Sequence, residues 1–94
     1  MHHVYILKSQ IAPKLYVGET GNSPDARLED HNKGRDADAY TRRYRPWDIV
    51  SCITVETKLQ ALKLESYLKS GAGRAFISKY LVPGTTTGAE HEIS

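Results

Sequence analysis

This 94-residue sequence contains a single cysteine and no long apolar run. Cys52 cannot form an intramolecular disulfide and has no Cys or His near it at metal-ligand spacing, so we predict a small buried hydrophobic residue. No apolar stretch approaches the length of a bilayer, so we expect no membrane association. The N-terminus lacks the basic segment and cleavage site of a secretory signal, and a cytoplasmic protein is the expectation.

The composition is that of a small globular domain. Hydrophobic residues make up 39% of the chain and charged residues 26%, which argues against a disordered protein. The net charge of +2 is too small to indicate nucleic-acid binding by itself. The segment "PGTTTGAEHEIS" has no periodicity, so we predict one domain over residues 1–82 and a flexible tail over residues 83–94.

Three segments have the pattern of β-strands. "HVYILKS" and "KLYVG" flank the short connection "QIAP" and predict an N-terminal hairpin. An even loop would place Tyr5 and Tyr16 opposite each other on one face of the sheet. "WDIVSCITVE" is rich in β-branched and apolar residues on both alternations, which predicts a buried third strand.

The intervening segments contain helix signals. Ser23 and Pro24 suit the start of a helix that Gly34 would stop, and Arg27 and His31 then share a face. "RDADAYTRRYRP" is predicted to be a loop.

Thr57 and Gln60 form a capping box before a second helix, and "GRAFISKYLV" favours one more. The order β-β-α-β-α-α predicts an α+β domain with a small three-stranded, mainly antiparallel sheet flanked by helices.

A carboxylate interrupts the apolar stripe of the helix in "LQALKLESYLKS". Ala61, Leu64 and Leu68 follow the spacing of a core-facing stripe, and the position that completes the stripe is Glu65. Taken alone, Glu65 could lie at the edge of the stripe with its carboxylate in water, or pair with Arg27.

Five motifs together carry a resemblance to a known family. They are "VYI" at 4–6, "YVG" at 16–18, "RLEDHN" at 27–32, "YTRRYRPW" at 40–47 and "ALKLESYLKSGAGRAFI" at 61–77. In order and spacing they resemble the GIY-YIG endonuclease superfamily, and most of all its small single-domain bacterial members. The resemblance implies a DNA endonuclease that hydrolyses phosphodiester bonds with a divalent metal, in DNA repair or recombination. The residues that it implies at the active site are Tyr5, Tyr16, Gly18, Arg27, His31 and Glu65.

The resemblance also implies roles for these side chains. Glu65 would hold one Mg²⁺, or Mn²⁺ in its place, and Arg27 would brace the phosphate oxygens. Tyr16 is a candidate general base, although a free phenol has a pKa of about 10 and needs nearby charge to ionise at neutral pH. His31, with an ordinary pKa of about 6.5, is the other candidate. The sequence leaves this choice open.

The basic residues gather in one region and predict contacts with DNA phosphates. With no second domain for targeting, we expect recognition of DNA shape, or help from a protein partner or a homodimer. An asparagine that some family members have after the glutamate helix is missing here, and this motivates an alternative, a non-catalytic nucleic-acid-binding module that keeps the fold. The predicted DNA-binding residues are Lys33, Tyr40, Arg42, Arg43 and Arg45.

Overall fold

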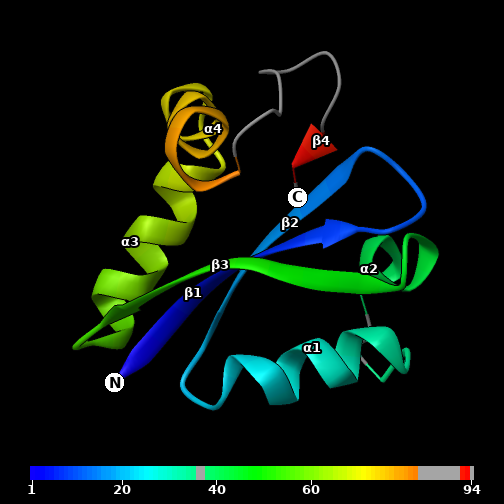
Figure 1. The fold of residues 1–94 in the computed structure, drawn as a ribbon. Coiled ribbons are helices and arrows are strands. Elements are labelled where there is room, and N and C mark those ends of the chain that lie inside the picture. The colour runs from blue at the N-terminus through cyan, green and yellow to red at the C-terminus, as the bar shows by residue number, and fades with distance from the viewer. Residues whose placement is uncertain (36–37, 83–91, 94) are drawn as a thin grey trace.

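A computed structural model of the chain describes residues 1–35, 38–82 and 92–93. Three strands, β1 (His2–Ser9), β2 (Lys14–Thr20) and β3 (Trp47–Val55), form an antiparallel sheet with β1 in the centre (Figure 1). A fourth, two-residue strand, β4 (Glu92–Ile93), pairs in parallel with the start of β2. The predicted α+β sheet of three strands is confirmed. The predicted tail, residues 83–94, lies outside the described residues apart from β4.

Helices flank the sheet as the sequence predicts. The first, α1 (Pro24–Asn32), begins at the predicted proline, and α3 (Lys58–Leu68) begins directly after Thr57, the N-cap residue of the predicted capping box with Gln60. The backbone of Gly34, just past α1, has a positive φ of 71°, a conformation that suits glycine. The other helical segments are α2 (Ala39–Arg43), α4 (Gly71–Phe76) and a single π-helical turn, η1 (Ile77–Leu81).

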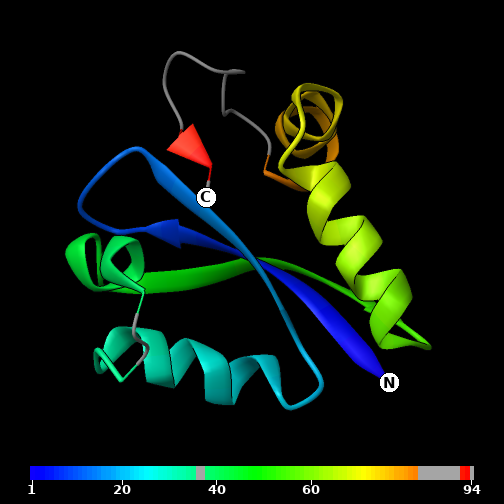
Figure 2. The same ribbon diagram turned by 180° about the vertical axis from the view of Figure 1, so that it is seen from behind.

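The two faces of the sheet carry different cores. Alternation along β1 sends Val4 and Ile6 to one face, where they pack with Ala61 and Leu68 of α3. Tyr5, on the opposite alternation, lies in a second, aromatic core that also contains Leu7, Trp47 and Leu28 of α1. Figures 1 and 2 show α1 and α3 running along different sides of the sheet. The functional candidates lie mainly in the aromatic core.

The segment predicted to be a loop, residues 35–46, contains the short helix α2, so that prediction was wrong for residues 39–43. The side chain of Asp38 accepts a hydrogen bond from the backbone N–H of Tyr40 and caps the helix. The indole N–H of Trp47 donates to the carbonyl oxygen of Thr41 at 2.8 Å, and Thr41 is fully buried. A cap and one tertiary contact therefore stabilise a helix too short to show periodicity.

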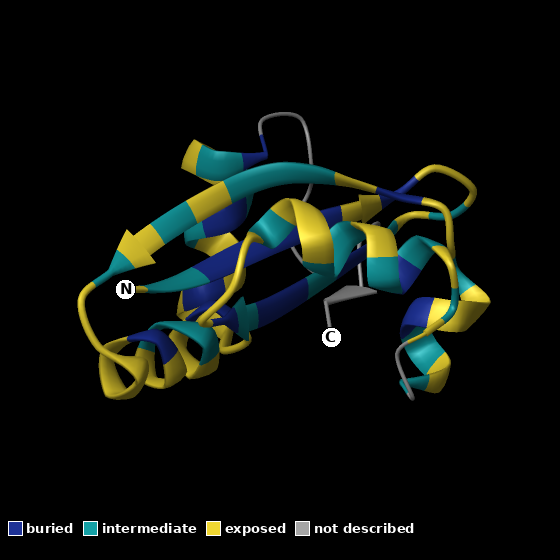
Figure 3. Cartoon of the chain, turned by 90° about the horizontal axis from the view of Figure 1, so that it is seen from below, coloured by how far each residue is buried: buried dark blue, intermediate teal, exposed yellow. Residues whose placement is uncertain are grey.

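The prediction of a buried third strand was also wrong. β3 is at the edge of the sheet, only Trp47 of its nine residues is buried, and Figure 3 shows mostly intermediate and exposed colours along it. Cys52 is exposed rather than buried. Partial burial of its sulfur, and then the charge of Asp25, nevertheless raise the pKa of the Cys52 thiol.

Within the described ranges, no helix has the length and apolar character needed to cross a bilayer.

Candidate active site

Two tyrosines and a histidine meet on the α1 side of the sheet. The ring centroids of Tyr5 and Tyr16 are 6.3 Å apart, and those of Tyr16 and His31 are 5.1 Å apart. The two phenols share one face, as predicted, but they are not opposite each other, because Tyr5 pairs with Gly18 and Leu7 pairs with Tyr16. They are diagonal neighbours, which still places both rings against His31.

Tyr5 and His31 form a buried hydrogen-bonded pair. The Oη atom of Tyr5 lies 2.9 Å from Nε2 of His31, and both side chains have almost no exposed surface. Tyr16 is different, because its side chain is only partly buried. Among these three residues, Tyr16 is therefore the one with surface exposed to solvent.

Gly18 allows the two tyrosine rings to pack against the strand. A Cβ atom at this position would lie 2.6 Å from Cζ and Oη of Tyr5 and 2.8 Å from Cε2 of Tyr16. Each of these distances is shorter than real Cβ contacts, so any side chain at residue 18 has to displace a ring. The glycine is thus required by the close approach of the rings and not by an unusual φ.

Gly18→Ala is expected to lower the free energy of unfolding by about 1–3 kcal/mol, because the added methyl group overpacks this cluster. Thermal and urea unfolding followed by circular dichroism would measure the change. Gly71→Ala is the matched control, since a Cβ at Gly71 meets no atom within 4 Å. Equal stability of the Gly18→Ala and Gly71→Ala proteins would contradict the proposed packing.

Glu65 lies on the sheet-facing side of α3, as predicted, and is only 23% exposed at its side chain. Its carboxylate forms an ion pair with Lys69, one turn later, at 3.8 Å. The Nζ atom of Lys69 also lies 6.0 Å from the ring centroid of Tyr16. Lys69 thereby links the carboxylate of α3 to the aromatic cluster.

A metal at this position would be held by the carboxylate of Glu65. Among the described residues there is no group of three or more His, Cys, Asp or Glu side chains that could hold an ion. Mg²⁺ suits such a setting, because it retains several waters and often takes its other ligands from substrate phosphates. The partly exposed carboxylate of Glu65 fits that pattern, and the Lys69 ammonium would have to move aside or share it.

Arg27 lies one helical turn before His31 on α1. Its guanidinium forms an ion pair with Asp30 at 3.3 Å on the same helix, and its side chain is 30% exposed. Asp30 also pairs with Arg35 at 3.4 Å. The guanidinium is thus held on α1 and remains partly open to solvent.

Tyr40 extends the aromatic cluster toward α2. Its hydroxyl donates to the carbonyl oxygen of Leu15 at 3.0 Å, and its ring lies 6.5 Å from Tyr16 and 6.0 Å from Trp47. This brings the predicted DNA-binding tyrosine beside Tyr16.

The predicted basic residues are distributed over α2 and its neighbours. Arg43 lies over the ring of Tyr44, and Arg42 is exposed beside it on α2. Arg45 packs against Gly34, where a Cβ atom would collide with its guanidinium. Lys33 pairs with Glu29, and this hydrogen bond lowers the pKa of the Glu29 carboxyl. Of these cations, Arg43 is the one that lines a pocket together with Tyr40.

Two side chains that shape this region, Lys69 and Asn32, were not predicted from the sequence. Lys69 could have been found from its i, i+4 spacing to Glu65 on one helix face. Asn32 bonds both backbone groups of Trp47, accepting from its N–H at 2.6 Å and donating to its carbonyl at 3.0 Å, which fixes the end of α1 to β3. No local signal in the sequence predicts this contact, because it joins segments fifteen residues apart.

Comparison with known proteins agrees with the motifs and the fold. A family model described as the GIY-YIG catalytic domain matches residues 1–80. UPF0213 proteins of Staphylococcus aureus strains Mu3, MW2 and COL are each 41% identical to the chain over 69 residues, which covers 73% of this chain and 80% of each relative. The family match extends over the strands β1, β2 and β3 and the helices α1, α2, α3 and α4. The chain is a member of the GIY-YIG nuclease family.

Proposed function

We propose that the protein is a divalent-metal-dependent endonuclease that hydrolyses phosphodiester bonds of DNA. The observation that carries this proposal is the position of Tyr16. Its partly exposed phenol lies between the buried Tyr5–His31 pair and the Lys69–Glu65 ion pair, in a chain of a nuclease family. A partly exposed tyrosine of this kind, near an ammonium group and a carboxylate, suits activation of water beside a phosphate.

Tyr16 is the better of the two candidate bases. His31 is completely buried, and its Nε2 atom is engaged by the hydroxyl of Tyr5. Direct access of the attacking water to His31 would require this buried pair to open, whereas Tyr16 is reachable in the structure as it stands. In this proposal Tyr16 takes the proton of the attacking water, and Tyr5 and His31 hold its ring in place.

Two cations would stabilise negative charge in the reaction, on the phenolate and on the phosphate. The Lys69 ammonium, beside the ring of Tyr16, favours the phenolate form and attracts the phosphate. Arg27 stays charged at every relevant pH and braces the non-bridging oxygens after it exchanges Asp30 for phosphate. Arg27 is on α1 and Lys69 is the C-cap residue of α3, so their Cα positions are fixed by the fold.

Glu65 would hold a hydrated Mg²⁺ or Mn²⁺, which when bound supplies a Lewis acid for the phosphate and leaving oxygens. The residues of the chain then perform the remaining tasks, namely binding, orientation and proton transfer. Because the described residues contain no group of three or more His, Cys, Asp or Glu side chains that could hold an ion, a one-metal reaction fits better than a two-metal one.

Cleavage of a panel of labelled DNAs tests the proposal. Duplex, nicked, flapped, branched and single-stranded substrates are incubated with the purified chain and Mg²⁺, Mn²⁺ or EDTA. The expected result is cleavage of at least one substrate with either metal and none with EDTA. DNA binding without cleavage on any substrate would instead favour a non-catalytic module, and salt-insensitive DNA association would contradict both readings.

A further inference from the structure

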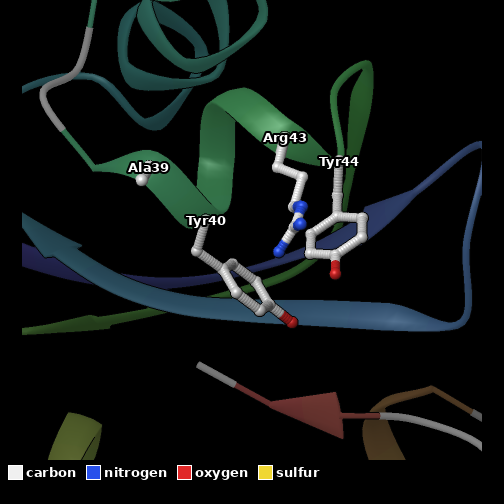
Figure 4. Close-up of a pocket in the computed structure, with 4 residues that line it drawn as sticks. All are labelled: Ala39, Tyr40, Arg43 and Tyr44. Atoms are coloured by element: carbon white, nitrogen blue, oxygen red, sulfur yellow. The ribbon is translucent and has the colours of Figure 1, made fainter.

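A pocket lies on α2, next to the candidate active site. It has a volume of about 350 Å³ and is lined by Ala39, Tyr40, Arg43 and Tyr44. Figure 4 shows the side chains of Tyr40, Arg43 and Tyr44 projecting from α2 toward the same side, over the strand β2. The pocket thus has two aromatic walls and a guanidinium, contributed by one short stretch of chain.

The aromatic walls are held in place by the fold. The rings of Tyr40 and Tyr44 meet edge to face with centroids 5.1 Å apart. Tyr40 is further fixed by its hydrogen bond to the carbonyl of Leu15 and by stacking on Trp47. The backbone carbonyl of Tyr44 accepts a hydrogen bond of 2.6 Å from the hydroxyl of Ser9. A ligand therefore meets walls that are already ordered, which reduces the entropy lost on binding.

Two cations accompany these rings. The guanidinium of Arg43 lies 5.8 Å from the centroid of the Tyr44 ring, and Nζ of Lys14 lies 5.2 Å from the same centroid. Rings alone would suit any flat apolar ligand, and cations alone would suit any phosphate. Their combination suits a ligand that is flat and aromatic at one end and anionic at the other, which is the chemistry of a nucleotide.

One aromatic ring separates this pocket from Tyr16. Tyr40 lines the pocket, and its centroid is 6.5 Å from that of Tyr16. A DNA strand whose phosphate lies at Tyr16 can therefore place a neighbouring nucleotide in the pocket. A base inside a duplex has both faces covered by adjacent base pairs, so only an unpaired or extruded base can enter.

We propose that the pocket binds one unpaired nucleotide of the DNA substrate, with the base stacked at Tyr44 and a phosphate held by Arg43 and Lys14. This inference rests on the proposed function and adds a substrate class to it. The preferred DNA has a single-stranded segment beside the bond that is cut. Because every base can stack on an aromatic ring, the pocket should add little sequence preference.

Fluorescence anisotropy without divalent metal tests the pocket separately from cleavage. Glu65→Gln protein is titrated with a labelled single-stranded oligonucleotide and with the same backbone carrying abasic sites. Tyr44→Leu is expected to weaken binding of the normal strand about ten- to a hundred-fold, and binding of the abasic strand by less than about twofold. Tyr80→Leu, which removes an exposed tyrosine on η1, is the matched control and should change the affinity for neither strand.

Arg43→Gln provides a second variant at an exposed position, where folding is not at risk. It should weaken binding of both strands and make the fall of log affinity with log salt less steep by about 1. Equal affinity of the normal and abasic strands, with or without Tyr44, would overturn the pocket assignment even if metal-dependent cleavage is observed. Tyr44-dependent binding of unpaired DNA without any cleavage would support the pocket and count against the endonuclease.

Discussion

Glu65→Gln is expected to abolish DNA cleavage while the chain stays folded. The substitution keeps the size of the side chain and removes the charge that would hold the metal beside Tyr16. Metal stabilisation of the transition state is worth several kcal/mol, so the cleavage rate should fall at least about a thousand-fold. The lost ion pair with Lys69 is partly exposed and contributes at most about 1 kcal/mol to folding. Gel-based cleavage rates with Mg²⁺ and thermal unfolding would measure the two effects.

The matched control for this experiment is Glu56→Gln, which makes the same chemical change at an exposed position before α3. Its cleavage rate should equal that of the unmodified chain. Arg27→Gln should be as inactive as Glu65→Gln and equally folded, because both are proposed to act on the same phosphate. Cleavage that survives equally in the Glu65 and Arg27 variants would assign the activity to another site or to a contaminant.

Tyr16→Phe is expected to reduce the cleavage rate about a hundred- to ten-thousand-fold, the range expected when a general base is removed. The ring and its contacts with Tyr5, His31 and Tyr40 remain, so the fold should be unaffected. Single-turnover cleavage with excess protein would separate this loss from any change in DNA affinity. Affinity should change little, because the phenyl ring still fills the same space.

Tyr5→Phe is the informative comparison, since it removes a hydroxyl in the same cluster. Its hydrogen bond to His31 is buried, so the loss should lower the free energy of unfolding by about 1–3 kcal/mol. The cleavage rate should fall less than in Tyr16→Phe. A larger rate loss in Tyr5→Phe, with Tyr16→Phe almost fully active, would show that the buried pair and not Tyr16 handles the proton.

Much of the fold could be predicted because its signals are local. Pro24 marks the start of α1, and the capping box of Thr57 and Gln60 marks the start of α3. The two strands of the hairpin have the expected bounds to within about two residues. The interrupted stripe is also confirmed, with Ala61 and Leu68 buried and Glu65 at its edge.

The wrong predictions for α2 and for Cys52 have one physical cause, because both features depend on tertiary contacts. The helix α2 depends on Trp47, which bonds the carbonyl of Thr41 from the next strand. Cys52 was expected to be buried because β3 is apolar on both alternations, but residue type does not reveal that a strand lies at the edge of its sheet. Neither the contact of the Trp47 indole nor the order of the strands can be predicted from a short stretch of sequence.

The grouping of the aromatic side chains at the candidate site could be predicted from the sequence, but their exact geometry could not. The choice of Tyr5, Tyr16 and His31 came from the family resemblance, and the structure brings their rings together. Their exact pairing depends on where the hairpin turns. It turns between Ile11 and Ala12, so Tyr5 faces Gly18 instead of Tyr16.

The separation of aliphatic and aromatic cores on the two faces of one sheet has a consequence for how this protein can evolve. Val4, Ile6 and Leu68 lie in the aliphatic core, where aliphatic side chains of similar volume can replace one another at small cost. Tyr5 and Trp47 fill the other core and also border the candidate site, so a substitution there alters stability and chemistry together. Substitutions should therefore accumulate in the aliphatic core, on the face of the sheet covered by α3, and stay rare in the aromatic core, on the face covered by α1. New substrate preferences should arise first through changes of the exposed side chains of α2.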